Sequence, residues 1–219
     1  GQGAPLLPIY HRAMVANVEK PVMILNLGGV ANITYIGTDG ELIAFDCGPA
    51  NALMDDFVKQ RRDLPYDENG ILAAQGQVHK NILDQFVRDE FFNIKPPKSL
   101  DRNQWGIDCV RYASVEDGLA TLLEMTIEGV ARACDHLPQM PRIVYAAGGG
   151  RKNAYMLGCL RTRLEVDVLP IDAVDWNGDA TEAEGFAYLA VRSLLGENLT
   201  MPSTTGAPNP LTGGVLYRV

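Results

Sequence analysis

Short apolar runs and helix-spaced apolar residues alternate along the chain in a definite order. Continuous or alternating apolar residues predict five strands, the first three joined by tight turns: 22–27, 31–36, 41–46, 142–147 and 166–169. Apolar residues at three- and four-residue spacing predict six helices: 9–18, 52–62, 79–91, 115–136, 153–164 and 180–195. Three antiparallel strands therefore precede a helix and later strand–helix units.

Polar and small residues mark where these elements should begin and end. Gly48–Pro49 should break the third strand, and Asn51 should cap the helix that follows. Ser114 should cap the long helix, with Asp117 three residues further on. Asp179 is placed to cap the last helix. The predicted helices thus begin at side chains that accept backbone N–H groups.

This order of elements is the ribonuclease-H-like layout, an α/β fold in which helices flank a mixed five-stranded sheet. Residues 1–21 form a segment before the first strand. Residues 63–113 contain one helix, a Lys-Pro-Pro-Lys run and a polar stretch, which we interpret as a helical insertion. We therefore expect residues 1–219 to form one domain whose strand-end loops are available for ligands.

Charge and cysteine usage exclude several classes of protein. A net charge of −8 opposes binding to nucleic acid and to anionic lipid. No apolar run approaches the ~18 residues of a membrane helix, so no membrane partner is expected. The four cysteines lack CxxC spacing, which indicates free thiols in a reducing compartment. We therefore expect a cytoplasmic protein.

Asp46 leaves the end of a predicted strand just before the Gly-Pro break. A carboxylate held there can face a cleft and take a proton from a substrate oxygen or water, or face a bound metal. The same pattern fits a plain turn acid stabilised by nearby N–H groups. The residues alone leave both interpretations open.

Three further segments are candidates for ligand binding. Gly28–Gly29 allow backbone N–H groups to approach a ligand oxygen, although a hairpin turn is the simpler interpretation. Gly148–Gly150 leave room for a flat ring or a phosphate before a helix N-terminus, or form a flexible connector. Glu182 falls in the first turn of the last predicted helix and points toward the strand ends, unless 179–182 form only a capping box.

Histidines and cysteines lack metal-ligand spacing, so we expect no zinc site. His79 and His136 fall in predicted helices and are expected at the surface, whereas the pattern leaves His11 undecided. No GxSxG motif is present, and nothing in the sequence indicates a serine triad.

Several segments in fixed order make a specific resemblance over the whole chain. They are GQGAPLLPIYH at 1–11, NLGGVANIT at 26–34, FDCGPANALMDD at 45–56, PYDENG at 65–70, PPKSLDRN at 96–103, AAGGGRKN at 146–153, GDATEAEGFAYLAVR at 178–192 and PSTTGAP at 202–208. Together they resemble the anhydro-N-acetylmuramic acid kinases of the sugar kinase/Hsp70/actin superfamily. The resemblance implies two ribonuclease-H-like domains with ATP in the cleft between them.

The resemblance also implies an activity and its ligands. Such an enzyme uses ATP and Mg²⁺ to open 1,6-anhydro-N-acetylmuramic acid with water and to phosphorylate O6, giving N-acetylmuramic acid 6-phosphate for cell-wall recycling. We therefore expect an amino sugar and ATP as partners, and count a homodimer among the assemblies open to the protein. The alternatives are a non-catalytic nucleotide- or sugar-binding module of the same fold, and a kinase for a different sugar.

Residue roles carry over from the matching motifs. Asp46 matches the aspartate of the family's FDTGPGN motif, the general base that activates the attacking water. Glu182 matches the glutamate of its GDxxEAxAFAWLA helix, which helps to order water or Mg²⁺; the metal ligands stay unassigned. The remaining expected positions border the phosphates, the adenosine or the sugar: Gly28, Gly29 and Asn32; Gly148, Gly149, Gly150 and Asn153; and Gly48, Asn51 and His11.

Three departures from the family pattern affect these expectations. Cys47 stands where the family usually has Thr, which weakens any hydroxyl contact to substrate. Ala50 stands where it often has Gly, which narrows the backbone choices beside Asn51. The family's N-terminal GTSxDG-type phosphate loop is absent, and Gly1 falls within its GGQGAP motif. We therefore expect the C-terminal part of such an enzyme, without its N-terminal domain.

Overall fold

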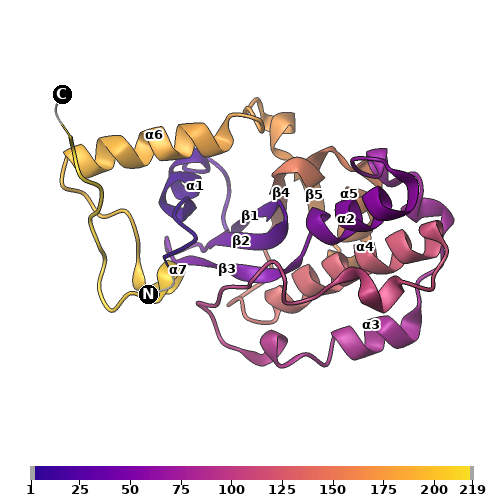
Figure 1. Cartoon of the computed structure of the whole chain (residues 1–219). Coiled ribbons are helices and arrows are strands. Elements are labelled where there is room, and N and C mark those ends of the chain that lie inside the picture. The colour runs from indigo at the N-terminus through magenta and orange to yellow at the C-terminus, as the bar shows by residue number, and fades with distance from the viewer. Residues whose placement is uncertain (1–2, 218–219) are drawn as a thin grey trace.

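A five-stranded mixed sheet forms the centre of the computed structural model, which describes residues 3–217 (Figure 1). β1 (Val22–Leu27), β2 (Val30–Ile36) and β3 (Leu42–Pro49) form an antiparallel meander. β4 (Ile143–Ala147) pairs in parallel with β1, and β5 (Asp167–Pro170) pairs in parallel with β4. The strand order β3-β2-β1-β4-β5 is the predicted ribonuclease-H-like layout.

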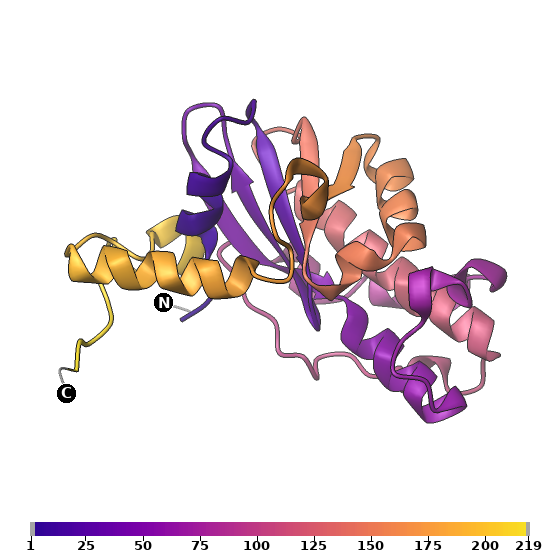
Figure 2. The same ribbon diagram turned by 90° about the horizontal axis from the view of Figure 1, so that it is seen from above.

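Helices cover both faces of this sheet (Figures 1 and 2). The helices on one face are α2 (Asn51–Arg62), α4 (Val115–Cys134) and α5 (Ala154–Leu164). The other face is covered by α1 (Pro8–Met14), and α6 (Thr181–Leu194) packs on α1. A short helix, α7 (Pro202–Thr205), packs against β3. No helix within residues 3–217 is long and apolar enough to cross a membrane.

Alternate residues of the strands enter two separate hydrophobic clusters. In β1, Met23, Leu25 and Leu27 belong to the cluster under α4, whereas Val22 and Ile24 belong to the cluster under α1 and α6. Side chains of a strand alternate between the two faces of a sheet. Asn26, at the next even position of β1, therefore faces the α1–α6 side, at the margin of its cluster.

Residues 63–113 fold along α4 as irregular turns and the short helix α3 (Lys80–Phe86). The helix predicted over 79–91 is wrong beyond Phe86, because Asp89 starts a separate 3₁₀ turn by accepting a hydrogen bond from the Phe91 amide at 2.9 Å. The segment closes around an aromatic cluster of Phe86, Phe91, Phe92 and Trp105, in which Phe92 and Trp105 are stacked.

Two other predicted boundaries are wrong for local reasons. Gly48–Pro49 do not break the third strand, because β2 remains paired with it as far as Pro49, with a bulge opposite Ala31 and Asn32. The first helix ends at Met14, because the Lys20 ammonium binds carbonyl oxygens of the turn that follows. In contrast, Ser114 caps α4 as predicted.

Candidate functional site

A row of polar residues crosses three strands on the α1–α6 face of the sheet. Asn26 lies opposite Asn32, and Asn32 lies opposite Asp46. On its other side, Asn26 lies opposite Ala147, the last residue of β4 before the glycine run. Neighbouring strands are about 4.8 Å apart, so the row leads from Asp46 to Gly148 over roughly 14 Å. The row therefore brings residues of β3, β2 and β1 and the start of the glycine run onto one face of the sheet.

Asp46 lies within β3, at the outer edge of the sheet, rather than at the end of a strand. Its N–H donates to the Lys98 carbonyl at 3.1 Å, and the Leu100 N–H donates to its Oδ2 at 2.7 Å. Burial raises the pKa of Asp46 above the usual value, and the Leu100 amide opposes that rise. The carboxylate is half-buried, and its raised pKa makes it a stronger base than a free aspartate.

The glycine run after β4 is packed closely against β1. Gly148 has a φ of +73°, and a Cβ there would lie 2.7 Å from the Leu27 carbonyl oxygen. A Cβ on Gly150 would lie 2.6 Å from the Leu27 Cβ, whereas one on Gly149 would meet nothing closer than Asn51 Nδ2 at 3.5 Å. Glycine is therefore required at the first and third positions by packing, which argues against a flexible connector.

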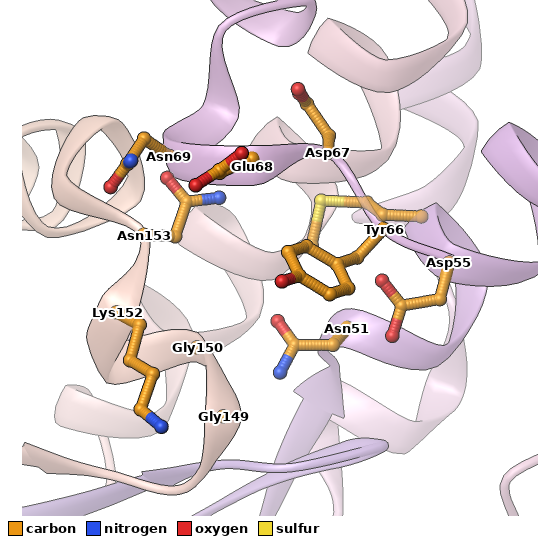
Figure 3. Close-up of a pocket in the computed structure, with 11 residues that line it drawn as sticks. Asn51, Asp55, Tyr66, Asp67, Glu68, Asn69, Gly149, Gly150, Lys152 and Asn153 are labelled. Carbon is orange, nitrogen blue, oxygen red and sulfur yellow. The ribbon is translucent and has the colours of Figure 1, made fainter. Parts of the chain in front are cut away.

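The first cavity, which we call the Tyr66 cavity, has a volume of about 400 Å³ and lies between α2, residues 66–69 and the glycine run (Figure 3). Gly149, Gly150 and Asn153 of the predicted adenosine contacts line it. Asn153 also caps α5, accepting a hydrogen bond from the Met156 amide at 2.9 Å. Figure 3 shows the Tyr66 ring projecting into the space between Asn51 and Asn153.

Asn51 does not cap α2, in contrast to the prediction. Its Nδ2 donates to the Leu27 carbonyl at 2.8 Å, and Ala50 occupies the cap position without a side-chain hydrogen bond. The backbone amides of Ala50 and Asn51 instead bind the carbonyls of Gly29 and Gly28 at 3.2 and 2.9 Å. The β1–β2 turn thus holds the start of α2, and the Asn51 side chain lines the Tyr66 cavity.

The second cavity, the Glu182 cavity, has a volume of about 320 Å³ and lies on the other side of the glycine run. Five predicted site residues line it: His11, Asn32, Gly148, Gly149 and Glu182. Its walls come from the N-terminal segment, the ends of β1 and β2, and the first turn of α6. Glu182 is therefore exposed at the strand ends, where the sequence predicted it. The cavity joins residues from four separate stretches of the chain.

Gly48 lies on the opposite side of β3 from this cavity. A Cβ on Gly48 would lie 3.2 Å from the Cα of Gly129 in α4, so the residue allows close helix–strand packing. The Cys47 thiol is buried beside it, and burial raises its pKa well above the usual value. These two residues contribute to the core under Asp46, and a role for Gly48 in substrate binding stays a prediction.

His11 lies beneath the Glu182 cavity with its ring buried. Its Nδ1 shares a 2.9 Å hydrogen bond with Thr34 Oγ1, and burial lowers its pKa to about 4. The ring is therefore neutral at pH 7. The expectation that His79 and His136 lie at the surface is wrong: both are half-buried, and His136 Nε2 binds the Phe92 carbonyl at 2.8 Å. Phe92 of the insertion binds His136, whereas His79 belongs to the insertion and its N–H donates to Thr121 Oγ1 of α4 at 3.0 Å.

A charge network missed by the sequence analysis fixes the start of α6. The buried guanidinium of Arg151 donates to Asp172 at 2.7 Å, to Asp179 at 2.8 Å and to the Gly148 carbonyl at 3.1 Å. Lys152 donates to Asp179 at 2.9 Å. The predicted cap at Asp179 is therefore wrong, because Arg151 and then Lys152 bind this carboxylate and lower its pKa. The sequence feature that could have predicted this network is the Arg-Lys pair after three glycines, followed by a stretch rich in aspartate.

The two cavities differ in their carboxylates: Asp55, Asp67 and Glu68 line the Tyr66 cavity, whereas Asp179 and Glu182 line the Glu182 cavity. Within residues 3–217, no group of three or more His, Cys, Asp or Glu side chains could hold a metal ion. Glu182 is the carboxylate that the Glu182 cavity offers besides Asp179, which already binds two cations. The geometry is thus that of an open polar surface, without a dedicated metal cage.

The family model and the individual relatives that match this sequence name the same family. The family model described as anhydro-N-acetylmuramic acid kinase matches residues 1–219. The chain is 53% identical over 219 residues to a protein of that name from Rhizorhabdus wittichii, and 49% identical over 220 residues to one from Zymomonas mobilis. Each alignment covers all of this chain and 60% of the relative. The chain thus spans about 60% of the length of these curated relatives.

A solved structure shows the same fold at low sequence identity. The activator of 2-hydroxyisocaproyl-CoA dehydratase from Clostridium difficile, with bound ADPNP, superposes with a TM-score of 0.52 at 13% identity. The match covers 86% of this chain and 68% of that one. This likeness shows the actin-like ATPase fold and nothing further. The family model matches all of residues 1–219, and the two relatives are 53% and 49% identical to this sequence. The chain therefore belongs to the anhydro-N-acetylmuramic acid kinase family.

Proposed function

We propose that this chain provides the general base and most of the nucleotide site of an ATP-dependent sugar kinase. The reaction opens 1,6-anhydro-N-acetylmuramic acid with water and phosphorylates O6 to give N-acetylmuramic acid 6-phosphate. The observation that supports it most is the polar row from Asp46 through Asn32 and Asn26 to the glycine run. In this row a carboxylate and the start of the glycine run lie on one face of the sheet, in a chain whose relatives are named anhydro-N-acetylmuramic acid kinase.

Asp46 acts on the attacking water in this proposal. The carboxylate takes a proton from the water as its oxygen bonds to C1 of the sugar, and the bond from C1 to O6 breaks. The released O6 attacks the γ-phosphorus of ATP, and ADP leaves. Burial raises the pKa of Asp46, which strengthens it as a base, and the Leu100 hydrogen bond keeps the ionised form available. Phosphoryl transfer otherwise depends mainly on positioning and charge neutralisation.

The nucleotide spans the glycine run in the proposed complex. The adenosine occupies the Tyr66 cavity against Gly149 and Gly150, and the phosphates extend toward the Glu182 cavity. Lys152 lines both cavities, and its exposed ammonium is suited to neutralise phosphate charge. The sugar lies over the Asp46 end of the polar row. The cytoplasm, where ATP is available, is the proposed location.

Mg²⁺ fits this surface only as an ion bound chiefly by phosphates. Mg²⁺ commonly uses one or two carboxylates together with waters and substrate phosphates, and such a site needs no cage of protein ligands. Glu182 supplies one exposed carboxylate at the cavity. When bound, the ion would neutralise phosphate charge, while Glu182 holds it directly or through water.

The Asp46→Asn variant tests the assignment of the base. In the protein encoded by the complete open reading frame, turnover of the anhydro sugar should fall by about 100- to 10,000-fold. ATP affinity should change by less than about twofold, because the amide keeps the shape of the carboxylate. The exposed turn residue Asp39 gives a matched control, Asp39→Asn. Undiminished formation of the 6-phosphate by Asp46→Asn would reject Asp46 as the base.

A second assay separates the kinase from a non-catalytic binding module. The 219-residue chain and the product of the complete open reading frame are compared with ATP and the anhydro sugar. The kinase proposal expects nucleotide binding by both and turnover by the longer protein. Binding without turnover by the longer protein would favour the module, and turnover of another sugar in preference would change the substrate assignment.

A further inference from the structure

Lys98 is a buried cation without a carboxylate partner. Its side chain is 5% exposed, and none of the ion pairs within residues 3–217 includes it. Its Nζ donates to the Phe91 carbonyl at 2.9 Å and lies 4.4 Å from the Phe91 ring centroid and 5.7 Å from that of Phe45. Burial lowers its pKa to about 8. Removing an ammonium from water opposes folding, so a buried lysine at this position is costly to stability.

Two backbone groups of residues 98–100 form hydrogen bonds with Asp46. The Lys98 carbonyl accepts from the Asp46 N–H at 3.1 Å, and the Leu100 N–H donates to Asp46 Oδ2 at 2.7 Å. Because β3 is an edge strand, its outer N–H and C=O groups have no neighbouring strand. Residues 98–100 cover this edge beside Asp46. A hydrogen bond to an ionised carboxylate is short and strong, as this one is.

The Lys98 ammonium joins two parts of the molecule that are distant in sequence. Phe45 precedes Asp46 on β3, whereas Phe91 belongs to the aromatic cluster of the insertion with Phe92 and Trp105. An ammonium between these two rings holds residues 98–100 against the strand that bears Asp46. A neutral side chain at position 98 would have neither the hydrogen bond to the Phe91 carbonyl nor the attraction to the two rings.

We propose that Lys98 is a positioning residue for Asp46, whose buried ammonium keeps the Leu100 amide on the carboxylate. This inference rests on the proposed role of Asp46 as general base. The consequence for chemistry is direct: the Leu100 hydrogen bond favours the ionised carboxylate and fixes one of its oxygens, so the other oxygen is directed to the water. Loss of Lys98 releases the Leu100 amide, which raises the pKa of Asp46. The rate of the chemical step falls because the carboxylate is no longer oriented toward the water.

Other titratable groups near β3 do not account for such a shift. His11 on α1 is neutral at pH 7, with a pKa lowered to about 4, and burial raises the pKa of the Cys47 thiol. His136, after α4, contacts the Phe45 ring on the opposite face of the strand from Asp46. α7 has no charged residue. A resonance of the Asp46 carboxyl carbon reports this group alone and separates it from His136.

The test replaces Lys98 with a neutral residue of similar length, Lys98→Met. We measure the pKa of Asp46 by carbon NMR on the 219-residue chain, and kcat and KM on the product of the complete open reading frame. The pKa should rise by about one unit, the size of a lost hydrogen bond to a charged group. kcat should fall by about tenfold with KM nearly unchanged, and the acid limb of the kcat profile should move to higher pH by the same amount.

Matched variants separate positioning from folding. Lys95→Met removes an exposed lysine three residues earlier and should change neither the pKa nor kcat. Methionine fills the volume of Lys98 without a buried charge, so the fold is expected to survive, and hydrogen exchange of the Leu100 amide reports the local bond directly. Lys98→Arg, which keeps the cation, should restore part of the rate. An unchanged Asp46 pKa and a protected Leu100 amide in Lys98→Met would overturn the inference.

The outcome also distinguishes this inference from the proposed function. A raised Asp46 pKa in Lys98→Met, together with full activity of Asp46→Asn, would keep the positioning role and reject the base. Inactive Asp46→Asn with unchanged Asp46 pKa in Lys98→Met would keep the base and reject the positioning role.

Discussion

The two cavities on either side of the glycine run are built in different ways. The Tyr66 cavity is walled by residues from 51–69 and by the glycine run, and its aromatic side chain is 55% exposed. The Glu182 cavity is walled by four separate stretches and rests on the buried His11 and Arg151. Gly149 and Lys152 line both. Binding in the first should therefore depend on single exposed side chains, and the second should depend on the integrity of the fold.

The largest expected effect comes from Gly148→Ala, which changes the residue just before Gly149, a residue that lines both cavities. A φ of +73° is strained for alanine, and the new Cβ would meet the Leu27 carbonyl oxygen at 2.7 Å and Asn26 Oδ1 at 2.6 Å. The free energy of unfolding should fall by about 3 kcal/mol, and both cavities should lose their ligands. Urea unfolding and nucleotide binding measure the two effects.

Gly149→Ala is the matched control for this substitution. A Cβ there has ordinary contacts, with Asn51 Nδ2 nearest at 3.5 Å. Stability should change by less than about 0.5 kcal/mol, whereas ligand binding on both sides should weaken because the residue lines both cavities. An equal loss of stability in the two variants would contradict the close packing of Gly148 against β1.

Local signals were enough to predict the five strands and their order along the chain. The glycine run follows an apolar strand, and the row from Asn26 to Asp46 lies within strands whose apolar residues are evident in the sequence. The boundaries that failed involve partners far along the chain. Pro49 stays in β3 because β2 pairs with it, and Asn51 turns from capping to binding the Leu27 carbonyl. Such contacts exist only after the sheet has formed.

A pH experiment contrasts the two cavities through His11 and Asp55. In the folded state burial lowers the pKa of His11 from 6.5 to about 4, so the unfolded state binds the proton more readily between these values. The stability linked to His11 is complete above pH 6.5 and is lost as the pH falls toward 4. This loss should be about 2 kcal/mol between pH 7 and pH 5. His11→Gln should flatten the dependence, measured by urea unfolding across that range.

Asp55, in the wall of the Tyr66 cavity, should act in the opposite direction. Burial and then the neighbouring Asp56 raise its pKa to about 6, so the folded state binds a proton more readily than the unfolded state. Lowering the pH from 7 to 4 therefore favours folding through this group and partly offsets the loss from His11. Asp55→Asn should make the acid loss steeper. A shallower dependence in Asp55→Asn would contradict the sign.

A smaller effect is expected from the charge network under the Glu182 cavity. Arg151→Met removes a guanidinium that is 5% exposed and binds Asp172, Asp179 and the Gly148 carbonyl. Both carboxylates can be hydrated afterwards, so the free energy of unfolding should fall by only about 1–2 kcal/mol. Amides at the start of α6 should exchange faster, whereas those of α5, beside the Tyr66 cavity, should not.

Lys152→Met serves as its control, because it removes the adjacent but exposed cation that binds Asp179. An exposed pair contributes about 0–1 kcal/mol, so stability should hardly change while nucleotide affinity falls. Arg151 also shows a limit of sequence analysis: the Arg-Lys pair was visible, but its partners lie 21 and 28 residues away and are fixed by the turn after β5. Lys98 and Asp46 are likewise joined only by the folded insertion.

The smallest expected effect is on the Tyr66 cavity itself. Tyr66→Ala removes a ring that projects into the cavity without taking part in the core, so the free energy of unfolding should be unchanged within about 0.5 kcal/mol. Stacking between aromatic rings contributes about 0.5–1.5 kcal/mol, so ATP affinity should fall by about 3- to 10-fold. Calorimetric titration of the 219-residue chain measures it, with Tyr112→Ala, an 88% exposed tyrosine elsewhere on the insertion, as control. If Tyr66→Ala left ATP affinity unchanged while Lys152→Met lowered it, the adenosine would belong on the Glu182 side of the glycine run.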